Sequence, residues 1–237
     1  MRLDKYVSKS LQITRNDAKK LISKKQIIVI NNDEKIIKLN SDYNLTNEKV
    51  FYGDKELIYK ENIYIMMNKP QGYVCANYDN HNKTIYDLIT DYKTTELGTI
   101  GRLDIDTEGL VVITSDGDLI HRITSPKNNH YKKYYVEVDG SFKEDDIKLF
   151  QNGIIINDDG EEYKCKEAIL EIIDSNKAYI KISEGKFHQI KKMINTLSLN
   201  VTYLKRIEIG KLKLDESLKL GEYRELNDEE INLLLNS

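Results

Sequence analysis

Apolar residues at helical spacing open the sequence, and basic residues occupy the positions between them. The apolar positions of the first stretch are Leu3, Tyr6, Val7 and Leu11. Thr14 can cap a second helix, expected over residues 15–25, because Asp17 stands at its third position, where it can accept from the first turn. This pattern predicts two amphipathic helices whose outward faces are basic.

The periodicity then changes from helical spacing to short apolar runs. Residues 26–30 and 35–39 are rich in isoleucine and valine and are separated by a polar turn at 31–34. Such a pair predicts a β-hairpin, which completes a small module after the two helices. The polar segment 52–62 is interpreted as a linker into the next apolar run.

From residue 60 onward, strand-like and helix-like segments are mixed, which is typical of a compact α+β domain. The strand-like runs are 63–67, 110–114, 134–138, 178–182 and 201–209. The helix-like runs are 84–90, 117–124, 144–151, 187–198 and 228–235, the last capped by Asn227.

Composition excludes several classes of protein. No apolar run in the 237 residues approaches the roughly 20 needed to cross a bilayer, and the first residues lack the apolar core of a signal peptide. The two cysteines, Cys75 and Cys165, are far apart, so we expect packed thiols in a reduced, cytoplasmic protein. Because the four histidines are scattered, no metal site is predicted.

The charge distribution indicates a polyanionic partner that the net charge conceals. The whole chain carries −3, but residues 1–60 hold 13 basic and 8 acidic residues, a net charge of +5. The remaining residues therefore carry −8. A basic module attached to an acidic body is the pattern expected when the first part contacts nucleic acid.

The segment 101-GRLDIDTEGL-110 concentrates four charges between two glycines, before an apolar run. A calcium loop is one interpretation, but its twelfth position, which should be a bidentate glutamate, falls on Ser115. A solvated turn is another. The third is an active site, in which one carboxylate acts as nucleophile or general base beside a cation.

Four motifs favour the active site. GRLDIDTEGL resembles the central G-R-L-D-x-x-T-x-G-L motif of the pseudouridine synthases. YIMMNKPQGYVCA (64–76), KKYYVEV (132–138) and EGKFHQIKKM (184–193) resemble the other motifs of that family, in the family's order. The chain therefore resembles the pseudouridine synthases. The form of its last motif is most similar to that of the pseudouridine synthases that act on small-subunit ribosomal RNA.

The first part of the chain resembles an S4-type RNA-binding domain, on the pattern RLDKYV…TRNDAKKLI…IIVINN, with Gln26 where that family usually has glycine. The two resemblances imply an S4-like α/β domain over 1–57. They imply a synthase domain over 58–237, built on a mixed, largely antiparallel sheet with flanking helices.

The resemblance implies isomerisation of uridine to pseudouridine in ribosomal RNA, most consistent with the small-subunit (16S) RNA. The reaction is redox-neutral and transfers nothing from outside, so no cofactor and no nucleotide cosubstrate are expected. The implied partner is ribosomal RNA or an assembly intermediate, without a membrane, and a monomer is expected. Large-subunit RNA as substrate, or a non-catalytic RNA-binding assembly factor, remain the alternatives.

The motifs also assign residue roles. Asp104 matches the catalytic aspartate, which attacks the sugar or assists glycal formation, and Lys191 matches the basic residue that pairs with it. Tyr134 matches the pocket tyrosine, and Tyr135 then faces the other side of the strand. Arg102 is expected to assist base extrusion or RNA contact.

Other residues receive lesser roles. Lys69 and His188 are both expected to bind the RNA substrate, Lys69 at the cleft floor and His188 on the cleft face of helix 187–198. The opposite stripe of that helix, facing the core, comprises Phe187, Ile190, Ile194 and Leu197. Thr107 should shape the loop by a side-chain hydrogen bond and Gly109 by a positive φ.

Two groups of charges complete the expectations. Asp106 and Glu108 are interpreted as solvated bystanders. The basic helices are expected to contact RNA phosphates, which position an enzyme without reading sequence. The residues concerned are Arg2, Lys5, Arg15, Lys19 and Lys20.

Overall fold

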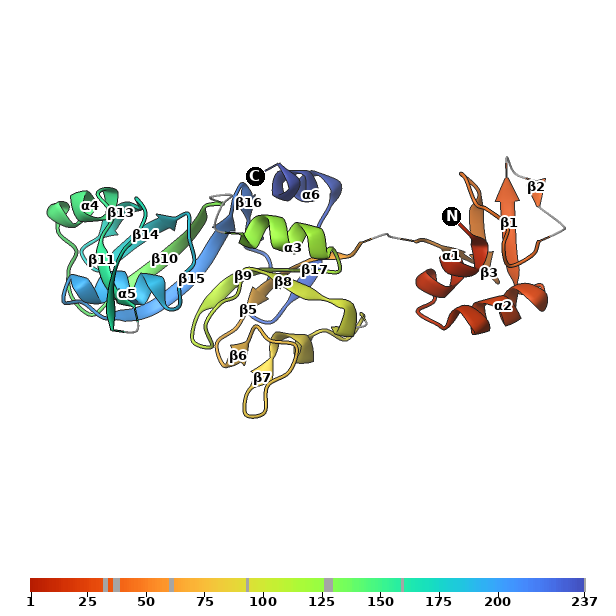
Figure 1. Ribbon diagram of the computed structural model, residues 1–237, viewed down its shortest axis with the longest axis horizontal. Coiled ribbons are helices and arrows are strands. Elements are labelled where there is room, and N and C mark those ends of the chain that lie inside the picture. The colour runs from red at the N-terminus through yellow and green to blue at the C-terminus, as the bar shows by residue number, and fades with distance from the viewer. Residues whose placement is uncertain are drawn as a thin grey trace. The chain divides into compact units, whose positions relative to one another are not determined.

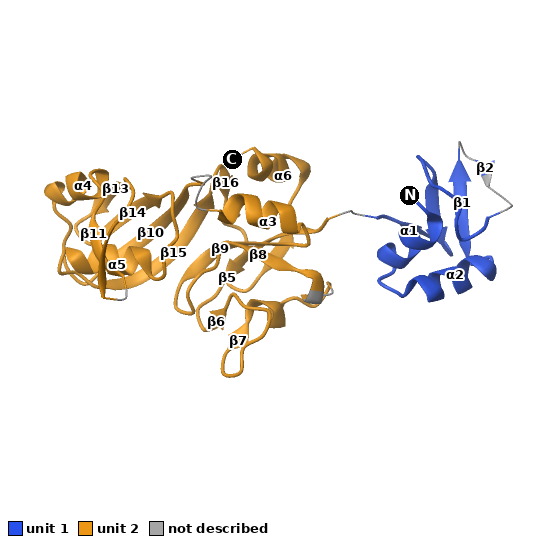
Figure 2. Cartoon of the chain, in the orientation of Figure 1, with its two compact units in different colours: residues 1–61 blue, residues 62–237 orange. Residues whose placement is uncertain are grey.

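The computed structural model describes residues 1–31, 34–35, 39–59, 62–92, 94–125, 130–158 and 160–236. The chain forms two compact units, unit 1 over residues 1–61 and unit 2 over residues 62–237 (Figure 2). The boundary expected from the sequence was between residues 57 and 58, and the structure divides the chain four residues later.

Unit 1, in its described part, packs two helices on a four-stranded antiparallel sheet of order β2-β1-β3-β4 (Figure 1). Its elements are α1 (Leu3–Ser10), α2 (Arg15–Ser23), β1 (Ile27–Asn31), β2 (Glu34–Lys35), β3 (Lys49–Tyr52) and β4 (Lys55–Leu57). Both predicted helices are confirmed, and Thr14 caps α2 by accepting from the Asp17 amide. Leu3 and Val7 of α1 are fully buried in this core.

The segment interpreted as a linker, 52–62, is partly structural, so that prediction is wrong. Residues 55–57 form β4, which pairs with β3 and buries Leu57. Tyr6 donates its hydroxyl hydrogen to the Leu57 carbonyl at 2.7 Å, which fastens this strand to α1. Residues 60 and 61, and residues 36–38 of the predicted strand 35–39, lie outside the described residues.

Unit 2 is built on one mixed sheet, which has nine strands among the described residues. Its main path is β13-β14-β10-β15-β9-β5-β17, with β16 paired to β15 and β8 to β9. These strands are β5 (Tyr64–Lys69), β8 (Gly98–Ile100), β9 (Glu108–Thr114), β10 (Lys132–Val138), β13 (Ile169–Asp174), β14 (Lys177–Ile182), β15 (Val201–Ile209), β16 (Leu212–Lys213) and β17 (Tyr223–Glu225). Within the described part of this sheet, β15 and β9 pair in parallel and the other pairs are antiparallel. The expected mixed, largely antiparallel sheet is confirmed.

The other elements of unit 2 lie outside this sheet, and the short strands among them pair in two separate two-stranded sheets, β6-β7 and β11-β12 (Figure 1). These other elements are β6 (Tyr73–Val74), β7 (Lys83–Thr84), the 3-10 helices η1 (Ile85–Leu88) and η2 (Thr94–Glu96), α3 (Gly117–Thr124), α4 (Glu144–Gln151), β11 (Ile155–Asp158), β12 (Glu161–Lys164), α5 (Gln189–Thr196) and α6 (Asp228–Leu235). The helix expected over 84–90 is therefore a single 3-10 turn. No described helix combines the length and apolar content needed to cross a membrane.

Both faces of the central strands are buried, which explains their continuous apolar runs. Ile65 and Met67 of β5 face one core with α4 and α5, whereas Met66 faces a second core with α3 and α6. The face of β10 opposite the first core is less covered, and there Tyr135 contacts Tyr179 and Tyr203 edge to face.

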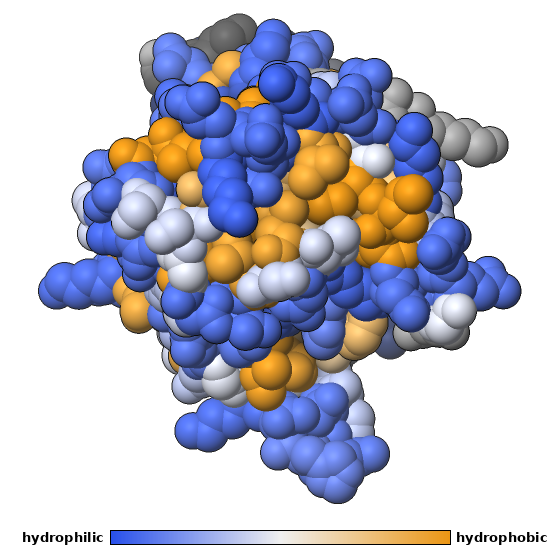
Figure 3. Space-filling view, turned by 90° about the vertical axis from the view of Figure 1, so that its left-hand side faces the viewer, coloured by the Kyte–Doolittle hydropathy of each residue, from blue (hydrophilic) through white to orange (hydrophobic). Residues whose placement is uncertain are grey.

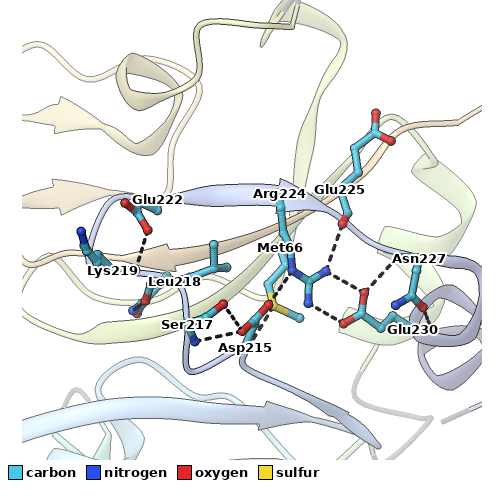
Figure 4. A network of polar contacts seen from close by, with 11 residues as sticks. Met66, Asp215, Ser217, Leu218, Lys219, Glu222, Arg224, Glu225, Asn227 and Glu230 are labelled. Carbon is cyan, nitrogen blue, oxygen red and sulfur yellow. Dashed lines mark hydrogen bonds and ion pairs between the residues drawn. The ribbon is translucent and has the colours of Figure 1, made fainter.

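The last helix, α6, is fastened to the sheet by a network of ionic contacts (Figure 4). Arg224 of β17 donates from Nε to Asp215 at 2.7 Å, and from Nη1 and Nη2 to the two carboxylate oxygens of Glu230 at 2.8 and 2.7 Å. Glu230 also accepts from the Asn227 amide, while the Asn227 side chain caps α6 as predicted. The bidentate geometry fixes the position of the helix.

Exposed apolar side chains gather at one end of unit 2. Figure 3 shows the face that carries α4 and β13, where apolar surface occupies the centre. Leu149 of α4 and Ile169 and Ile173 of β13 are about half exposed.

Candidate active site

The segment 101–107 connects β8 to β9 at the centre of the sheet of unit 2. Gly101 and Gly109 delimit it, with φ of +71° and +105°. A Cβ on Gly109 would lie 2.2 Å from the Arg206 carbonyl oxygen, so this position requires glycine for space as well as for its positive φ. The predicted conformation of Gly109 is confirmed, and it holds the loop directly against β15.

Arg206 of β15, which was not predicted as a site residue, holds this loop in place through its side chain. Its side chain is 1% exposed. Nε donates to the Leu110 carbonyl at 2.8 Å and Nη2 to the Gly101 carbonyl at 2.9 Å. The sequence did contain a sign of this role. Arg206 stands two residues after the apolar Leu204 in a strand, so both side chains point to the buried face, where a charged group requires hydrogen-bond partners.

Lys69 supports the same loop from the other side. It is fully buried, and its ammonium donates to the carbonyls of Asp104 at 2.9 Å and Thr107 at 2.8 Å. Burial lowers the pKa of Lys69, and the nearby thiol and carboxylates partly oppose that effect. The expected contact of Lys69 with substrate is therefore not available in this conformation, whereas a supporting role at the cleft floor agrees with these bonds.

Thr107 shapes the loop by a different route from the one predicted. Its amide donates to the Asp104 carbonyl at 3.1 Å, and its own carbonyl accepts from Lys69. Its hydroxyl is buried and has no hydrogen-bond partner in the structure. The predicted side-chain bond is therefore wrong, and the main chain of Thr107 closes the turn.

The Asp104 carboxylate lies among side chains from α5. Its Oδ2 atom is 3.4 Å from Lys191 Nζ and 3.7 Å from His188 Nε2. These residues are more than 80 positions apart in the sequence, and the structure brings them together as the motifs predicted. At this distance the Lys191 ammonium and the Asp104 carboxylate attract each other.

Asp106 is not a bystander, which corrects the interpretation from sequence. Lys191 Nζ donates to its two carboxylate oxygens at 2.6 and 2.8 Å, closer than its approach to Asp104. Burial raises the pKa of Asp106, but the hydrogen bond and charge of Lys191 outweigh it and leave the pKa below its ordinary value. Lys191 is thus shared between two carboxylates.

Glu108 is also engaged rather than solvated. Its carboxylate accepts from the Tyr203 hydroxyl at 2.6 Å. Burial and this hydrogen bond raise the pKa of Tyr203 well above its ordinary value. The contact lies where the Glu108 end of β9 pairs with β15.

A cleft of about 790 Å³ opens beside the loop. Tyr134 of β10 lines it, 8% exposed, together with Asp104 and Lys191. Tyr135 lies on the other face of the strand, as the alternation predicted. Arg102 and His188 also line the cleft. The structure therefore gathers five of the predicted site residues of unit 2 around one cavity, whereas the buried Lys69 does not line it.

Lys132 is a further cation of the cleft. Its ammonium donates to the His130 carbonyl at 3.1 Å. Burial, and then the charge of Arg206, lower the pKa of Lys132 to about 8, while Glu184 acts in the opposite direction. The charge on this side chain is therefore weakly compensated.

The helix expected over 187–198 is α5, which begins at Gln189. Ile190 and Ile194 face the core as predicted. Phe187, assigned to the same apolar stripe, is instead 65% exposed at the cleft, so that part of the prediction is wrong. The chain turns at His188, whose φ of +53° is left-handed, and this turn carries Phe187 away from the stripe.

The basic residues of unit 1 fall into two groups. Arg2 and Arg15 direct their guanidinium groups to the fully buried Asp4, at 3.2 and 2.9 Å. Burial raises the pKa of Asp4, and hydrogen bonds from Arg15 and Arg2 more than offset this, so the pKa lies below its ordinary value.

The lysines of that group are more available to a partner. Lys5 and Lys19 are exposed, and Lys20 forms an exposed ion pair with Asp17 at 2.9 Å. Charge remains on the helix surface, but less than the count of basic residues suggested. In the described part of the chain, no cluster of His, Cys, Asp or Glu could hold a metal ion, and both cysteines are buried free thiols.

Comparison with known proteins places these features in a family. The family model for RNA pseudouridylate synthase matches residues 63–196. The ribosomal small subunit pseudouridine synthase A of Haemophilus influenzae is 39% identical over 236 residues, which cover 99% of this chain and 100% of the relative. An uncharacterized RNA pseudouridine synthase of Bacillus subtilis is 38% identical, covering 99% and 98%. A crystal structure of a pseudouridylate synthase superposes with a TM-score of 0.69 at 37% identity, covering 99% of each chain.

Proposed function

The chain belongs to the RNA pseudouridylate synthase family and is an RNA pseudouridine synthase, and from this premise we propose that it isomerises a uridine of small-subunit (16S) ribosomal RNA with Asp104 as the catalytic carboxylate. The choice of RNA is supported by full-length relatives named for the small ribosomal subunit, among them those of Haemophilus influenzae and Escherichia coli. The form of the motif EGKFHQIKKM supports the same branch.

The observation that carries the catalytic assignment is the ion pair at the mouth of the cleft. Asp104 Oδ2 lies 3.4 Å from Lys191 Nζ, in the cavity that Tyr134 also lines. The reaction breaks the N-glycosidic bond of the uridine, turns the base and forms a carbon–carbon bond to the same sugar. An ionised carboxylate can attack the sugar or assist formation of a glycal, and Lys191 places a positive charge beside it for either route.

The other cleft residues are assigned complementary roles. Tyr134 stacks on the target base once it has left the RNA stack, a contact that contributes about 1–3 kcal/mol in single-strand binding. Arg102 contacts the RNA and assists extrusion of the base. Arg206 and Lys69 act as positioning residues, because they donate to main-chain carbonyls of the loop that carries Asp104 and of the strand that follows it.

Substitution of Asp104 by asparagine tests the catalytic assignment against a non-catalytic assembly factor. The variant keeps the shape of the side chain and removes its charge. We expect RNA affinity to remain and pseudouridine formation to disappear, measured on ribosomal RNA fragments with purified protein. Modification that survives in Asp104→Asn would show that another group is the catalyst.

Mapping of pseudouridines tests the choice of RNA. Ribosomal RNA from a strain lacking this protein should lose one pseudouridine in the small-subunit RNA and none in the large-subunit RNA. A loss confined to large-subunit RNA would overturn the substrate and leave the enzyme class intact.

Unit 1 is proposed to bind RNA phosphates through its exposed lysines, of which Lys5 and Lys19 have no ion pair among the described residues. Removing one phosphate-binding charge should reduce the slope of log affinity against log salt by about 0.7–0.9. We therefore expect the double variant Lys5→Gln, Lys19→Gln to bind RNA more weakly and with a flatter salt dependence. The control replaces Lys148 and Lys213, exposed lysines of unit 2 at 77% and 78% that lie 3.7 and 3.9 Å from Asp145 and Glu208. Equal slopes for the two double variants would exclude a specific role for unit 1.

A further inference from the structure

One aromatic side chain at the cleft is exposed where its neighbours on α5 are buried. Phe187 is 65% exposed and lines the cleft. The apolar stripe of α5 is complete without it, since Ile190, Met193 and Ile194 are each at most 5% exposed. A single exposed phenylalanine is ordinary on a protein surface, so its position, rather than its exposure alone, is what carries information.

The ring of Phe187 is held in a defined orientation. It stacks on the imidazole of His188, with ring centroids 3.7 Å apart and planes 21° from parallel. Lys192 Nζ lies 5.5 Å from the Phe187 centroid and is anchored by Asp158 at 2.7 Å. The two rings therefore form a preorganised platform, and the exposed fraction of Phe187 leaves ring surface open for another planar group.

The backbone at this point is strained in the way that functional sites often are. His188 has a φ of +53°, a left-handed conformation that residues other than glycine adopt uncommonly. The turn removes Phe187 from the core and places the imidazole toward the loop that carries Asp104. His188 Nε2 lies 3.7 Å from Asp104 Oδ2. The imidazole of the platform is therefore adjacent to that carboxylate, and the Phe187 ring lies on the imidazole.

We propose that the Phe187–His188 pair stacks on a nucleobase that neighbours the target uridine in the RNA chain, an inference that rests on the proposed function. When the target base leaves the stack, an adjacent base loses a stacking partner. Tyr134, 8% exposed inside the cleft, takes the extruded base, and Phe187 at the exposed end takes the neighbour. Aromatic side chains stack on any base, so this contact stabilises the opened RNA without reading its sequence.

The first test is a binding measurement made without turnover. The Asp104→Asn protein and its Phe187→Ala derivative are titrated with an RNA fragment that carries the uridine this enzyme modifies. Loss of one base stack should weaken binding by about 5- to 150-fold, and Phe187→Trp should restore it. Leu149→Ala, which removes a 48% exposed apolar side chain on α4, is the control and should leave the affinity unchanged.

The second test identifies the ligand as a base. Fragments lacking the nucleobase on the 5′ or the 3′ side of the target uridine are compared in the same two proteins. At one of the two positions, removal of the base should weaken RNA binding by the protein that contains Phe187 by the same 5- to 150-fold factor. The same removal should change the affinity of Phe187→Ala little. Equal losses in both proteins at both positions would overturn the proposal, and so would equal affinity of the two proteins for intact RNA.

These measurements stay separate from the test of the proposed function. They record binding to whichever RNA the mapping identifies, and they need no activity. A catalytically active Asp104→Asn enzyme would remove the catalytic assignment but leave the stacking result readable. If Phe187→Ala unfolds, Phe187→Leu, which keeps apolar volume and lacks a π face, replaces it with the same expected loss.

Discussion

Arg224 and Lys191 are both cations of unit 2 that face two carboxylates, yet they are suited to different tasks. Arg224 donates from all three nitrogens, with distances of 2.7 and 2.8 Å to Asp215 and Glu230. Lys191 holds Asp106 at 2.6 Å and approaches Asp104 only to 3.4 Å. Their exposures are similar, at 33% and 22%, so accessibility does not distinguish them.

The difference lies in how completely each cation is satisfied. The hydrogen bonds that Arg224 donates to Glu230 and then to Asp215 raise the pKa of Arg224. Hydrogen bonds donated by Ser217 and then by Arg224 lower the pKa of Asp215 to about 2. The planar guanidinium has its donors directed at fixed acceptors, whereas the lysine ammonium is a point charge on a flexible stem. Arg224, whose donors all have acceptors, holds α6 in place. Lys191, which is shared between two carboxylates beside a cleft, can move from one carboxylate toward the other when substrate enters.

The largest effect expected from this comparison is on the rate of Lys191→Met. Removing the cation takes away the positive charge beside Asp104, and loss of one electrostatic contact at a reacting centre typically lowers kcat by about 10²- to 10³-fold. Single-turnover pseudouridine formation measures this rate. The urea midpoint should change little, and Lys191→Arg should restore part of the rate. A normal rate in Lys191→Met would remove this ion pair from the mechanism.

Arg224→Met should show the opposite result, a loss of stability without a loss of rate. Loss of the guanidinium leaves Asp215 and Glu230 without their partner, and hydrogen bonds to charged groups each contribute about 1.5–3 kcal/mol. Because the pair is partly exposed, we expect the free energy of unfolding to fall by about 2 kcal/mol, measured by urea denaturation. The rate per folded molecule should be unchanged. A loss of rate at unchanged stability would contradict the structural role.

Asp106→Asn sharpens the comparison by giving Lys191 a single carboxylate. The ammonium can then move toward Asp104, because no second carboxylate competes for it. We expect the rate of pseudouridine formation at pH 7 to change by about 3- to 10-fold. The control, Glu108→Gln, keeps the Lys191 contacts. A rate in Asp106→Asn equal to that of the control would mean that the two carboxylates do not compete for Lys191.

Lys132 extends the comparison to a cation without an ion pair in the described part of the chain, and the smallest effect is expected there. Its pKa of about 8 lies below the ordinary 10.5, so between these values the unfolded chain binds more protons than the folded one. The contribution of Lys132 to the free energy of unfolding is therefore least favourable below pH 8 and improves as pH rises toward 10.5.

The matching measurement is urea denaturation of Lys132→Met against the wild type at several pH values. The variant should be more stable at pH 7, by on the order of 1 kcal/mol once screening by cleft water is allowed for, and this advantage should shrink by pH 9. Lys133→Met is the control, since Lys133 lies one residue along and contacts Glu171 at 3.5 Å on the opposite face. A gain that does not change with pH would refute the explanation by charge burial.

The features predictable from sequence were those that local pattern or motif order specifies. Ile190 and Ile194 follow helical periodicity, and the alternation of Tyr134 and Tyr135 follows strand geometry. The approach of Asp104 to Lys191 came from the order of motifs, because no local rule relates residues so far apart.

The features that were not predicted depend on the conformation of single residues and on contacts between residues distant in the sequence. Helical periodicity placed Phe187 in the core because the pattern of apolar residues does not predict the left-handed turn at His188. Lys69 and Arg206 are residue types normally assigned to the surface, and their carbonyl partners in the loop 101–107 and at Leu110 are distant from them in the sequence. Asp106 looked solvated because the nearer of its possible cations, Arg102, is not the one that binds it.

The parallel pairing of β9 with β15 has a consequence for when activity first exists. Arg206 donates to the carbonyl of Leu110, 96 positions earlier, and α5, which carries Lys191, is made between those two strands. A chain emerging during synthesis can pair β5 with β9 long before the loop 101–107 has Arg206 against it or Lys191 beside Asp104. If the proposed function holds, activity requires the chain to have passed Arg206, and the onset of pseudouridine formation during translation would report the moment at which β15 enters the sheet.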